Sequence, residues 1–286
     1  LSGLYYLRNG DTYMIDKNAP VGVFDSGVGG LTVAREIMRN LPSEKIVYFG
    51  DTARVPYGSK SKDNIIKFSR QIIRFLQTEN VKAIVIACNT ASALALDEMQ
   101  QEFDLPILGV VKPGAKVAVE TTANKRIGLI GTEANIRSGV YTRYIKSLDD
   151  EAKVFEKACP LFVPLVEEGW LHDDITLQVA SRYLEELKEK DIDTLIMGCT
   201  HYPLIRSTIR KVMGDKVNLV NPAYETAIEL KNLLERDNLA NKCDVDSPSS
   251  MYRFYVSDAE EKFKLFANSI LPFDITMTKQ INIENY

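Results

Sequence analysis

The chain has 286 residues, 45% of them hydrophobic and 26% charged, which is the composition of a soluble globular protein of one or two domains. The net charge of −4 argues against a nucleic-acid-binding protein, and no apolar run approaches the length of a membrane span. Residues 1–20 lack the basic region and apolar core of a signal peptide. The four cysteines are too few for a disulfide scaffold and form no C-x-x-C pair, so we expect a reducing cytoplasm.

Short apolar runs alternate with segments of helical periodicity along most of the chain. In the first part we predict strands at 21–24, 45–49, 83–87 and 105–111, and helices at 31–41, 65–76 and 94–103. In the second part we predict strands at 127–130, 154–158, 194–197 and 217–220, and helices at 138–148, 179–187 and 204–213. The tail adds a helix at 227–234, a strand at 252–256 and a helix at 263–270.

Strands that are apolar throughout and alternate with helices predict parallel sheets covered on both faces. We therefore predict an α/β fold with two lobes, each a mainly parallel sheet flanked by helices. Crossovers between the lobes are expected at Lys112-Pro113-Gly114 and at Asn221-Pro222. One lobe then comprises residues 18–113 and 224–286, and the other residues 114–223. Residues 1–17 are set apart as an N-terminal extension, either native or left over from an expression tag.

Two cysteines stand in nearly the same local sequence, Cys88 in IACNT and Cys199 in MGCTH. Each ends a predicted strand and precedes a helix-like stretch. Ligands of parallel sheets bind beyond the carboxyl ends of the strands, so facing lobes would place one thiol on each wall of a cleft. A single cysteine at such a place is commonly a small buried hydrophobe. A matched pair, however, is what proton removal from both faces of a carbon centre needs, and a helix N-terminus predicts a lowered thiol pKa.

Three other segments are candidates for the same site. The loop DSGVGG at 25–30 opens a helix, and either its amides hold an anion or it is only a tight turn. Pro56-Tyr57-Gly58 is either a turn with a packed aromatic ring or a loop whose amides bind a carboxylate. His201 could share a proton with Cys199 or hold a carboxylate. One carboxylate of Glu167-Glu168 could point into the cleft, with a solvated turn as the alternative.

The remaining cysteines and the cofactor motifs add little to this site. Cys159 is expected in the core, and Cys243 in a polar surface loop over 241–250. No lysine context resembles a pyridoxal phosphate site, and no glycine-rich nucleotide loop is present. We therefore expect chemistry that needs no cofactor and no metal.

At these motifs the sequence resembles the glutamate racemases of the aspartate/glutamate racemase superfamily. The resemblance is carried by ordered segments: 22–30 (GVFDSGVGG), 50–52 (GDT), 56–58 (PYG), 87–91 (ACNTA), 113–115 (PGA), 131–132 (GT), 158–160 (ACP) and 198–204 (GCTHYPL). The two cysteine motifs in this order are highly specific, whereas any one of the others would be weak.

The resemblance implies two pseudo-symmetric lobes with the active site between them and cofactor-independent racemisation of free glutamate. D-glutamate would then supply peptidoglycan synthesis, and with it cell-wall formation and cell shape. The two bases match Cys88, for D-glutamate, and Cys199, for L-glutamate, assisted by Asp25 and His201, with Glu167 as a supporting acid. The substrate-contacting positions match Asp25, Ser26, Tyr57, Gly58, Asn89, Thr90, Thr200 and His201. Relatives are commonly dimers, so we expect a homodimer.

Two alternatives remain open. An aspartate racemase of the same superfamily would share the two thiols and differ by one methylene of substrate. A non-catalytic amino-acid-binding protein would have the same two lobes with inert thiols. The sequence also departs from the family at Asn221-Pro222-Ala223, where a Ser-Gly pair is common, so the turn geometry at the second crossover stays open.

Overall fold

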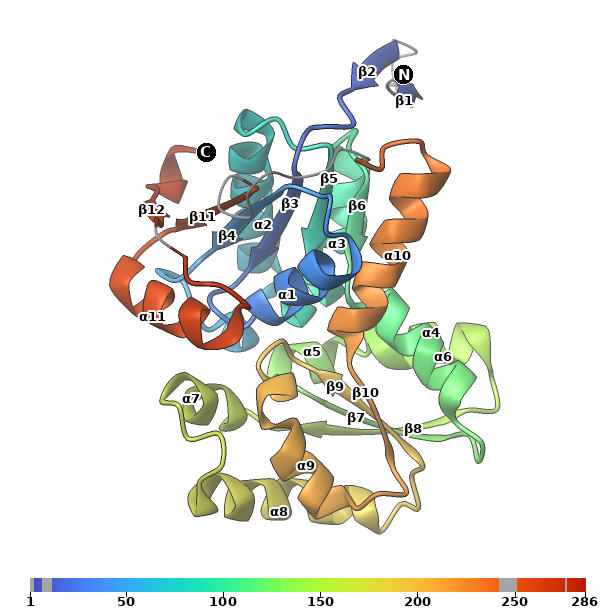
Figure 1. Ribbon diagram of the computed structural model, residues 1–286. Helices are drawn as coiled ribbons and strands as arrows, with labels where there is room; N and C mark the ends of the chain where they lie inside the picture. The colour runs from blue at the N-terminus through green and yellow to red at the C-terminus, as the bar shows by residue number, and fades with distance from the viewer. Residues whose placement is uncertain (1–2, 7–11, 242–250, 276) are drawn as a thin grey trace.

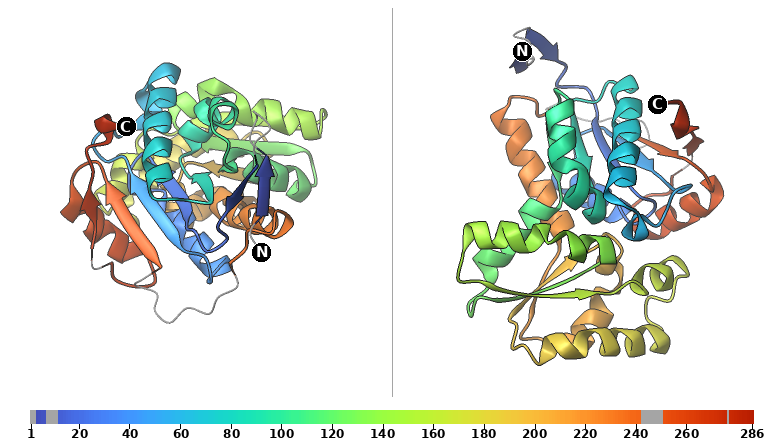
Figure 2. Two further views of the ribbon diagram at one scale, coloured as in Figure 1. Left: turned by 90° about the horizontal axis from the view of Figure 1, so that it is seen from above. Right: turned by 180° about the vertical axis from the view of Figure 1, so that it is seen from behind.

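The computed structural model describes residues 3–6, 12–241, 251–275 and 277–286. Two lobes lie one above the other, each built on a parallel sheet with helices on both faces (Figures 1 and 2). The upper lobe holds both ends of the chain, and the lower lobe is formed by the middle of the chain (Figure 1). Within the described residues, no helix is both long enough and apolar enough to span a bilayer.

The upper sheet has six strands in the order β12-β11-β4-β3-β5-β6, and all its neighbouring pairs are parallel. The strands are β3 (Val21–Asp25), β4 (Ile46–Gly50), β5 (Ala83–Ile86), β6 (Ile107–Gly109), β11 (Tyr252–Val256) and β12 (Lys279–Gln280). In β4, Ile46 and Tyr48 join one apolar core and Val47 and Phe49 join the other. Burial on both faces explains why the central strands are apolar throughout.

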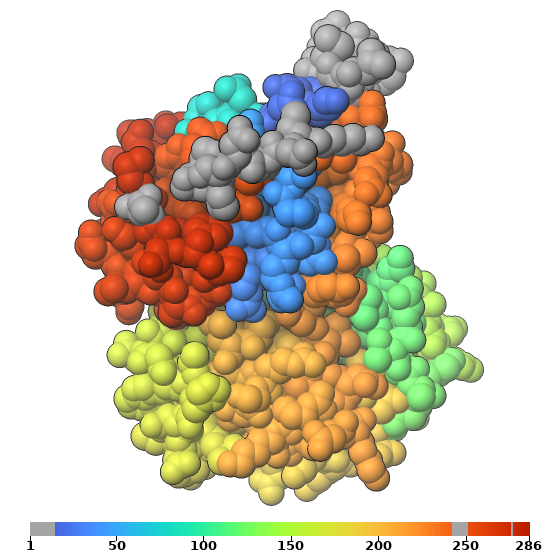
Figure 3. Space-filling model, viewed as in Figure 1, coloured from blue at the N-terminus to red at the C-terminus, as the bar shows by residue number. Residues whose placement is uncertain are grey.

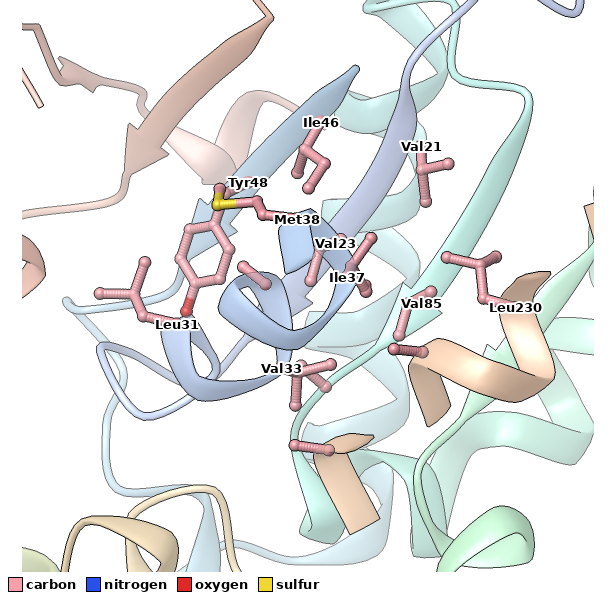
Figure 4. Close-up of a cluster of buried hydrophobic side chains, with 14 of the residues drawn as sticks. Val21, Val23, Leu31, Val33, Ile37, Met38, Ile46, Tyr48, Val85 and Leu230 are labelled. Carbon is pink, nitrogen blue, oxygen red and sulfur yellow. The ribbon is translucent and has the colours of Figure 1, made fainter. Parts of the chain in front are cut away.

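Helices cover both faces of the upper sheet. One face carries α1 (Leu31–Asn40), α10 (Pro222–Arg236) and α11 (Glu260–Ile270); the other carries α2 (Lys62–Thr78) and α3 (Asn89–Glu102). Figure 4 shows Ile37 of α1 and Leu230 of α10 in one buried cluster with Val23 and Val85 of the sheet. The helical face predicted from the spacing of apolar residues in α1 is therefore the face that packs on the strands.

The lower sheet has four parallel strands in the order β10-β9-β7-β8. They are β7 (Arg126–Gly131), β8 (Lys153–Ala158), β9 (Thr194–Gly198) and β10 (Asn218–Val220). One face packs against α7 (Phe162–Glu167), α8 (Asp174–Lys188) and α9 (Arg206–Met213), and the other against α4 (Val111–Thr121) and α6 (Val140–Leu148). Cys159 follows β8 and is buried in this core, as predicted.

The two sheets share one topology. The order β4-β3-β5-β6 in the upper lobe and the order β8-β7-β9-β10 in the lower lobe both run second, first, third, fourth along the chain. In such sheets ligands bind where the strand order reverses, between the first strand and the third. Phe24 pairs with Ile86 there, and Ile130 pairs with Met197. Cys88 and Cys199 each lie two residues beyond a paired residue of the third strand, so the predicted pseudo-symmetric α/β fold is confirmed.

Both predicted crossovers are the starts of helices rather than turns. Lys112-Pro113-Gly114 lies in the first turn of α4. Asn221 caps α10, because its side chain accepts the N–H of Ala223 at 3.2 Å, and Pro222 occupies the first helical position. Proline is favoured at that position, so Asn-Pro-Ala needs no glycine. We propose that the lobes divide at 113/114 and 223/224, with α4 packing on the lower sheet and α10 on the upper sheet.

Several predicted boundaries were wrong, for local reasons. The strand expected at 105–111 is only Ile107–Gly109, because Val111 already begins α4. The helix expected at 138–148 begins at Val140, because the left-handed Gly139 (φ 60°) separates it from α5 (Glu133–Ser138).

The segment set apart at 1–17 contains a pair of antiparallel strands, β1 (Gly3–Tyr6) and β2 (Thr12–Ile15). Cys243 and most of the loop predicted at 241–250 lie outside the described residues.

Candidate functional site

A small cavity lies between the lobes at the carboxyl ends of both sheets. Its walls are formed by Ser26, Val55, Pro56, Tyr57, Gly58, Cys88, Asn89 and Thr90 from the upper lobe and by Thr132, Val163, Cys199, Thr200 and His201 from the lower lobe. Its volume is about 20 Å³, which is room for about one water molecule. The lobes meet along a seam on the face shown in Figure 3, and the cavity lies between them.

Cys88 lies where β5 ends and α3 begins. It is the N-cap of α3: its Sγ accepts the N–H of Ala91 at 3.5 Å, and the residue is 5% exposed. Burial raises the pKa of Cys88 to about 12, and the charge of Asp25 acts in the same direction. These effects outweigh the hydrogen bonds from Ala91 and Ser26, so the lowered pKa predicted from the helix N-terminus is wrong for Cys88.

The Cys199 side chain is connected in series with two other side chains of the lower lobe. Its Sγ lies 3.8 Å from Nδ1 of His201, and Nε2 of His201 lies 3.1 Å from Oε1 of Glu167. Burial alone would lower the pKa of His201, but the hydrogen bonds with Cys199 and Glu167 prevail and raise it to about 10. The hydrogen bond to His201 lowers the pKa of Glu167 against the effect of burial. The imidazole therefore favours its charged form beside the Cys199 thiol.

Asp25 occupies the centre of the DSGVGG loop. Its Oδ2 accepts the N–H groups of Gly27 and Gly30 at 3.0 and 2.9 Å, and its Oδ1 accepts the hydroxyl of Thr200 at 3.5 Å. The residue is fully buried, and burial raises its pKa. The loop amides thus hold a carboxylate of the chain itself. Asp25 stands behind the cavity wall and acts on Cys88 through its charge.

The glycine loop also brings the two lobes together. A Cβ on Gly29 would lie 2.4 Å from Oγ1 of Thr200 and 2.5 Å from Nδ1 of His201. Thr32 donates its hydroxyl hydrogen bond to the backbone oxygen of Thr200 at 3.0 Å. Glycine at position 29 is therefore required for this close approach, whatever the backbone conformation.

The Pro56-Tyr57-Gly58 loop is held from behind by Asp51. The hydroxyl of Tyr57 donates to the Asp51 carboxylate, which also accepts Nε of Arg54 at 2.7 Å and the hydroxyl of Ser257 at 2.9 Å. The Tyr57 hydroxyl is therefore engaged by Asp51, which does not line the cavity, whereas Tyr57 itself forms part of the wall. Gly58 packs directly on the lower lobe, because a Cβ there would lie 2.7 Å from Cβ of Thr132.

The two residues after Cys88 both bond to the lower lobe. Oδ1 of Asn89 accepts the hydroxyl of Tyr141 at 2.7 Å, and the hydroxyls of Thr90 and Thr132 lie 2.9 Å apart. The first turn of α3 is therefore fixed at two points by the opposite lobe.

Most of the predicted site residues line this cavity. Asp25 and Glu167 are the exceptions, and both stand behind it. The sequence reasoning missed Val55, Thr132 and Val163 as wall residues. Thr132 could have been found, because it follows the first strand of its lobe as Ser26 does in the other. Across the described residues, no three His, Cys, Asp or Glu side chains are grouped so that they could hold a metal ion.

Comparisons with known proteins agree along nearly the whole chain. The Asp/Glu/Hydantoin racemase family model matches residues 28–228. A glutamate racemase from Geobacter metallireducens is 44% identical over 264 residues, 92% of this chain and 97% of that protein. The structure of glutamate racemase isoform RacE1 from Bacillus anthracis is similar, with a TM-score of 0.88 and 39% identity, covering 93% of this chain and 98% of that one. Glutamate racemase from Francisella tularensis, solved in complex with D-glutamate, gives a TM-score of 0.87 at 38% identity, covering 94% and 100%.

Proposed function

The chain is a member of the Asp/Glu/Hydantoin racemase family, and we propose that it interconverts L-glutamate and D-glutamate by proton transfer between two thiols. One observation carries this proposal: Cys88 and Cys199, from equivalent positions of the two lobes, line the same cavity. Glutamate is proposed as the substrate because the similar proteins are glutamate racemases, one of them solved with D-glutamate.

Two thiols suit inversion of a carbon centre. Racemisation removes the α-proton from one face and delivers a proton to the other. Two groups on opposite walls can do both without turning the substrate over, so the reacting atoms stay in place between the steps. The equivalent placement of Cys88 and Cys199 in the two lobes supports this arrangement.

The surroundings of the thiols suggest which one acts as the base. His201 favours its charged form and is anchored by Glu167, so a positive charge lies beside the Cys199 sulfur, where negative charge develops when it acts as a base. The raised pKa of Cys88 keeps it protonated at neutral pH, so it can donate. We therefore assign Cys199 as the base and Cys88 as the acid for L-glutamate, with the roles exchanged for D-glutamate. Asp25 would act on Cys88 by charge and by ordering the glycine loop.

Proton transfer by positioned groups supplies only part of the acceleration, typically about 10²- to 10⁴-fold. The α-proton of an amino acid is weakly acidic, so negative charge developing on the α-carboxylate must also be stabilised. The side chains of Asn89, Thr90 and Thr200 and the amides of the wall loops are the proposed donors. Closure of the lobes excludes water and strengthens these interactions.

The small cavity implies a conformational step. Room for about one water molecule is too little for an amino acid, so the lobes must separate to admit glutamate and release product. The contacts between the lobes include the bonds from Asn89 and Thr90 to the lower lobe and the bond from Thr32 to Thr200. We therefore expect opening, rather than chemistry, to limit turnover.

A chiral assay of the purified protein tests the proposed function. L-glutamate, D-glutamate, L-aspartate and D-aspartate are incubated separately, and the enantiomers are resolved. We expect each glutamate enantiomer to be converted until the two are equal, with at least tenfold slower conversion of aspartate. Faster conversion of aspartate would show that aspartate is the substrate. Binding of glutamate without turnover would show that the protein is a binding protein and not an enzyme.

The cellular setting is proposed on the same basis. D-glutamate formed by this reaction would supply peptidoglycan synthesis and so cell-wall formation. The described cysteines, Cys88, Cys159 and Cys199, are free thiols, which suits a cytoplasmic protein. A homodimer is proposed, and light scattering of the eluted protein would test it against the monomer mass.

A further inference from the structure

The hydroxyl of Tyr141 links the two lobes at the edge of the cavity. Tyr141 lies at the start of α6 in the lower lobe and is 1% exposed. Its hydroxyl donates to Oδ1 of Asn89, at 2.7 Å, in the first turn of α3 of the upper lobe. Asn89 directly follows Cys88 and lines the cavity, whereas Tyr141 stands behind the wall. The hydrogen bond therefore joins a buried side chain of one lobe to a cavity residue of the other.

This bond decides which end of the Asn89 amide faces the cavity. A primary amide carries an acceptor oxygen and a donor NH₂ group on opposite sides. The Tyr141 hydroxyl occupies the oxygen. Nδ2 has no hydrogen-bond partner among the described residues, and it keeps some exposed surface. Nδ2 is therefore open to the cavity, where it can donate to a carboxylate. The flipped amide would present its oxygen and repel the same group.

The Tyr141 hydroxyl lies in apolar surroundings that keep it a hydrogen-bond donor. Its ring packs among apolar side chains of the lower core, including Val111 and Ile145. Burial raises the pKa of Tyr141, with the charge of Cys199 adding to the effect, so the phenol stays protonated and remains a donor. Within the described part of the chain, Asn89 is its hydrogen-bond partner.

We propose that Tyr141 is a positioning residue that sets the Asn89 amide to donate from Nδ2 to a substrate carboxylate. Because Tyr141 and Asn89 belong to different lobes, the amide is set only when the lobes are closed. The hydrogen bond between Thr90 and Thr132 closes beside it. This inference rests on the proposed function for the identity of the carboxylate ligand, glutamate.

A double-mutant cycle between Tyr141→Phe and Asn89→Ala tests the assignment. Tyr141→Phe keeps the ring and removes only the hydroxyl. We expect it to lower kcat/KM for both enantiomers by about tenfold, the effect of losing one well-placed donor. In the Asn89→Ala background the same change should alter kcat/KM less than twofold, because no amide remains to be positioned. The same cycle is repeated with the dissociation constant of D-glutamate, which is measured by calorimetry. This constant can be obtained even for variants whose turnover is too slow to follow.

Tyr202→Phe is the matched control. The Tyr202 hydroxyl is equally buried but donates to the backbone oxygen of Cys159, at 2.9 Å, within the lower lobe. Any factor by which Tyr202→Phe lowers kcat/KM should multiply with the factor for Asn89→Ala, as expected for two independent effects. Tyr141→Phe within twofold of wild type, or a loss that multiplies fully with that of Asn89→Ala, would overturn the assignment. A wild-type protein that neither binds nor racemises glutamate would instead refute the proposed function.

Discussion

Nε2 of His201 lies 3.1 Å from Oε1 of Glu167, although the two residues come from different elements of the lower lobe. His201 follows β9 and is 2% exposed, and Glu167 ends α7 behind it. The pair places a buried positive charge within 3.8 Å of the Cys199 sulfur. This relationship separates the two thiols chemically, because Cys88 has Asp25 near it instead.

Glu167→Gln should reduce kcat/KM by about 10- to 100-fold, the effect of replacing a charge-assisted hydrogen bond worth about 1.5–3 kcal/mol. Glu168→Gln is the matched control, because Glu168 is the next residue but is exposed. Steady-state kinetics in both directions check the pair. Equal effects of the two substitutions would contradict the anchoring role of Glu167.

The titration of His201 should reflect its partners directly. Its imidazole signal in NMR spectra should have a midpoint near pH 10, and Glu167→Gln should lower that midpoint. The chain has two histidines, so the signal lost in His201→Asn identifies it. A midpoint near the ordinary value of about 6.5 would contradict the charged pair.

The same pKa shift predicts a pH-dependent contribution to stability. The pKa of His201 in the folded protein, about 10, lies above its ordinary value of about 6.5. The folded state therefore binds the extra proton, and the stabilisation is complete below about pH 6.5 and lost as the pH rises through about 10. In urea unfolding, the free-energy difference between wild type and His201→Asn should shrink over this range. A constant difference would contradict it.

Gly29→Ala should be far more harmful than Gly27→Ala. The added Cβ at 29 would collide with Thr200 and His201, whereas a Cβ at 27 would lie 3.6 Å from Val55, an ordinary contact. The collision must push the lobes apart near Cys199, and a displacement of about 1 Å can cost about 100-fold in rate. We expect kcat/KM to fall by at least that factor for Gly29→Ala and by less than tenfold for Gly27→Ala. Similar losses would show that the lobes do not need this close approach.

Asp51→Asn should destabilise the upper lobe by about 1.5–3 kcal/mol, because it removes the buried carboxylate that pairs with the largely buried Arg54 guanidinium at 2.7 Å and leaves it the more exposed Glu284 carboxylate at 3.1 Å. The exposed pair Lys62–Glu98 has the same 2.7 Å separation and serves as the control. Glu98→Gln should cost less than about 1 kcal/mol. Urea unfolding measures both, and equal costs would contradict the role of burial. We also expect a higher KM in Asp51→Asn, because Tyr57 loses its anchor.

The sequence was most informative where burial is reflected in a continuous local pattern. Apolar runs such as Ile46–Gly50 located the strands of both sheets, and the matched frames of Cys88 and Cys199 located the site. The pattern was less informative where tertiary contacts decide. Val111 reads as the end of a strand but begins a helix, because it packs on the lower sheet rather than beside β5.

Contacts between the lobes could not be predicted from the sequence for the same reason. Nothing local in Tyr141 indicates that its hydroxyl reaches Asn89, 52 residues away. The direction of the Cys88 pKa was also wrong, because the helix N-terminus is a local effect whereas burial and the charge of Asp25 depend on the packed structure. Thr132 was missed although its position in the lower lobe repeats that of Ser26 in the upper lobe.

Hydrogen exchange during a single conversion tests the central claim most directly, namely that Cys88 and Cys199 act from opposite faces of one carbon atom. Each glutamate enantiomer is incubated in heavy water, and the α-position of product and of unreacted substrate is measured early in the reaction. Two thiols on opposite walls predict product that carries one solvent deuterium, while the recovered substrate keeps its original hydrogen. Product that retains the original hydrogen, or recovered substrate that gains deuterium as fast as product forms, would contradict it.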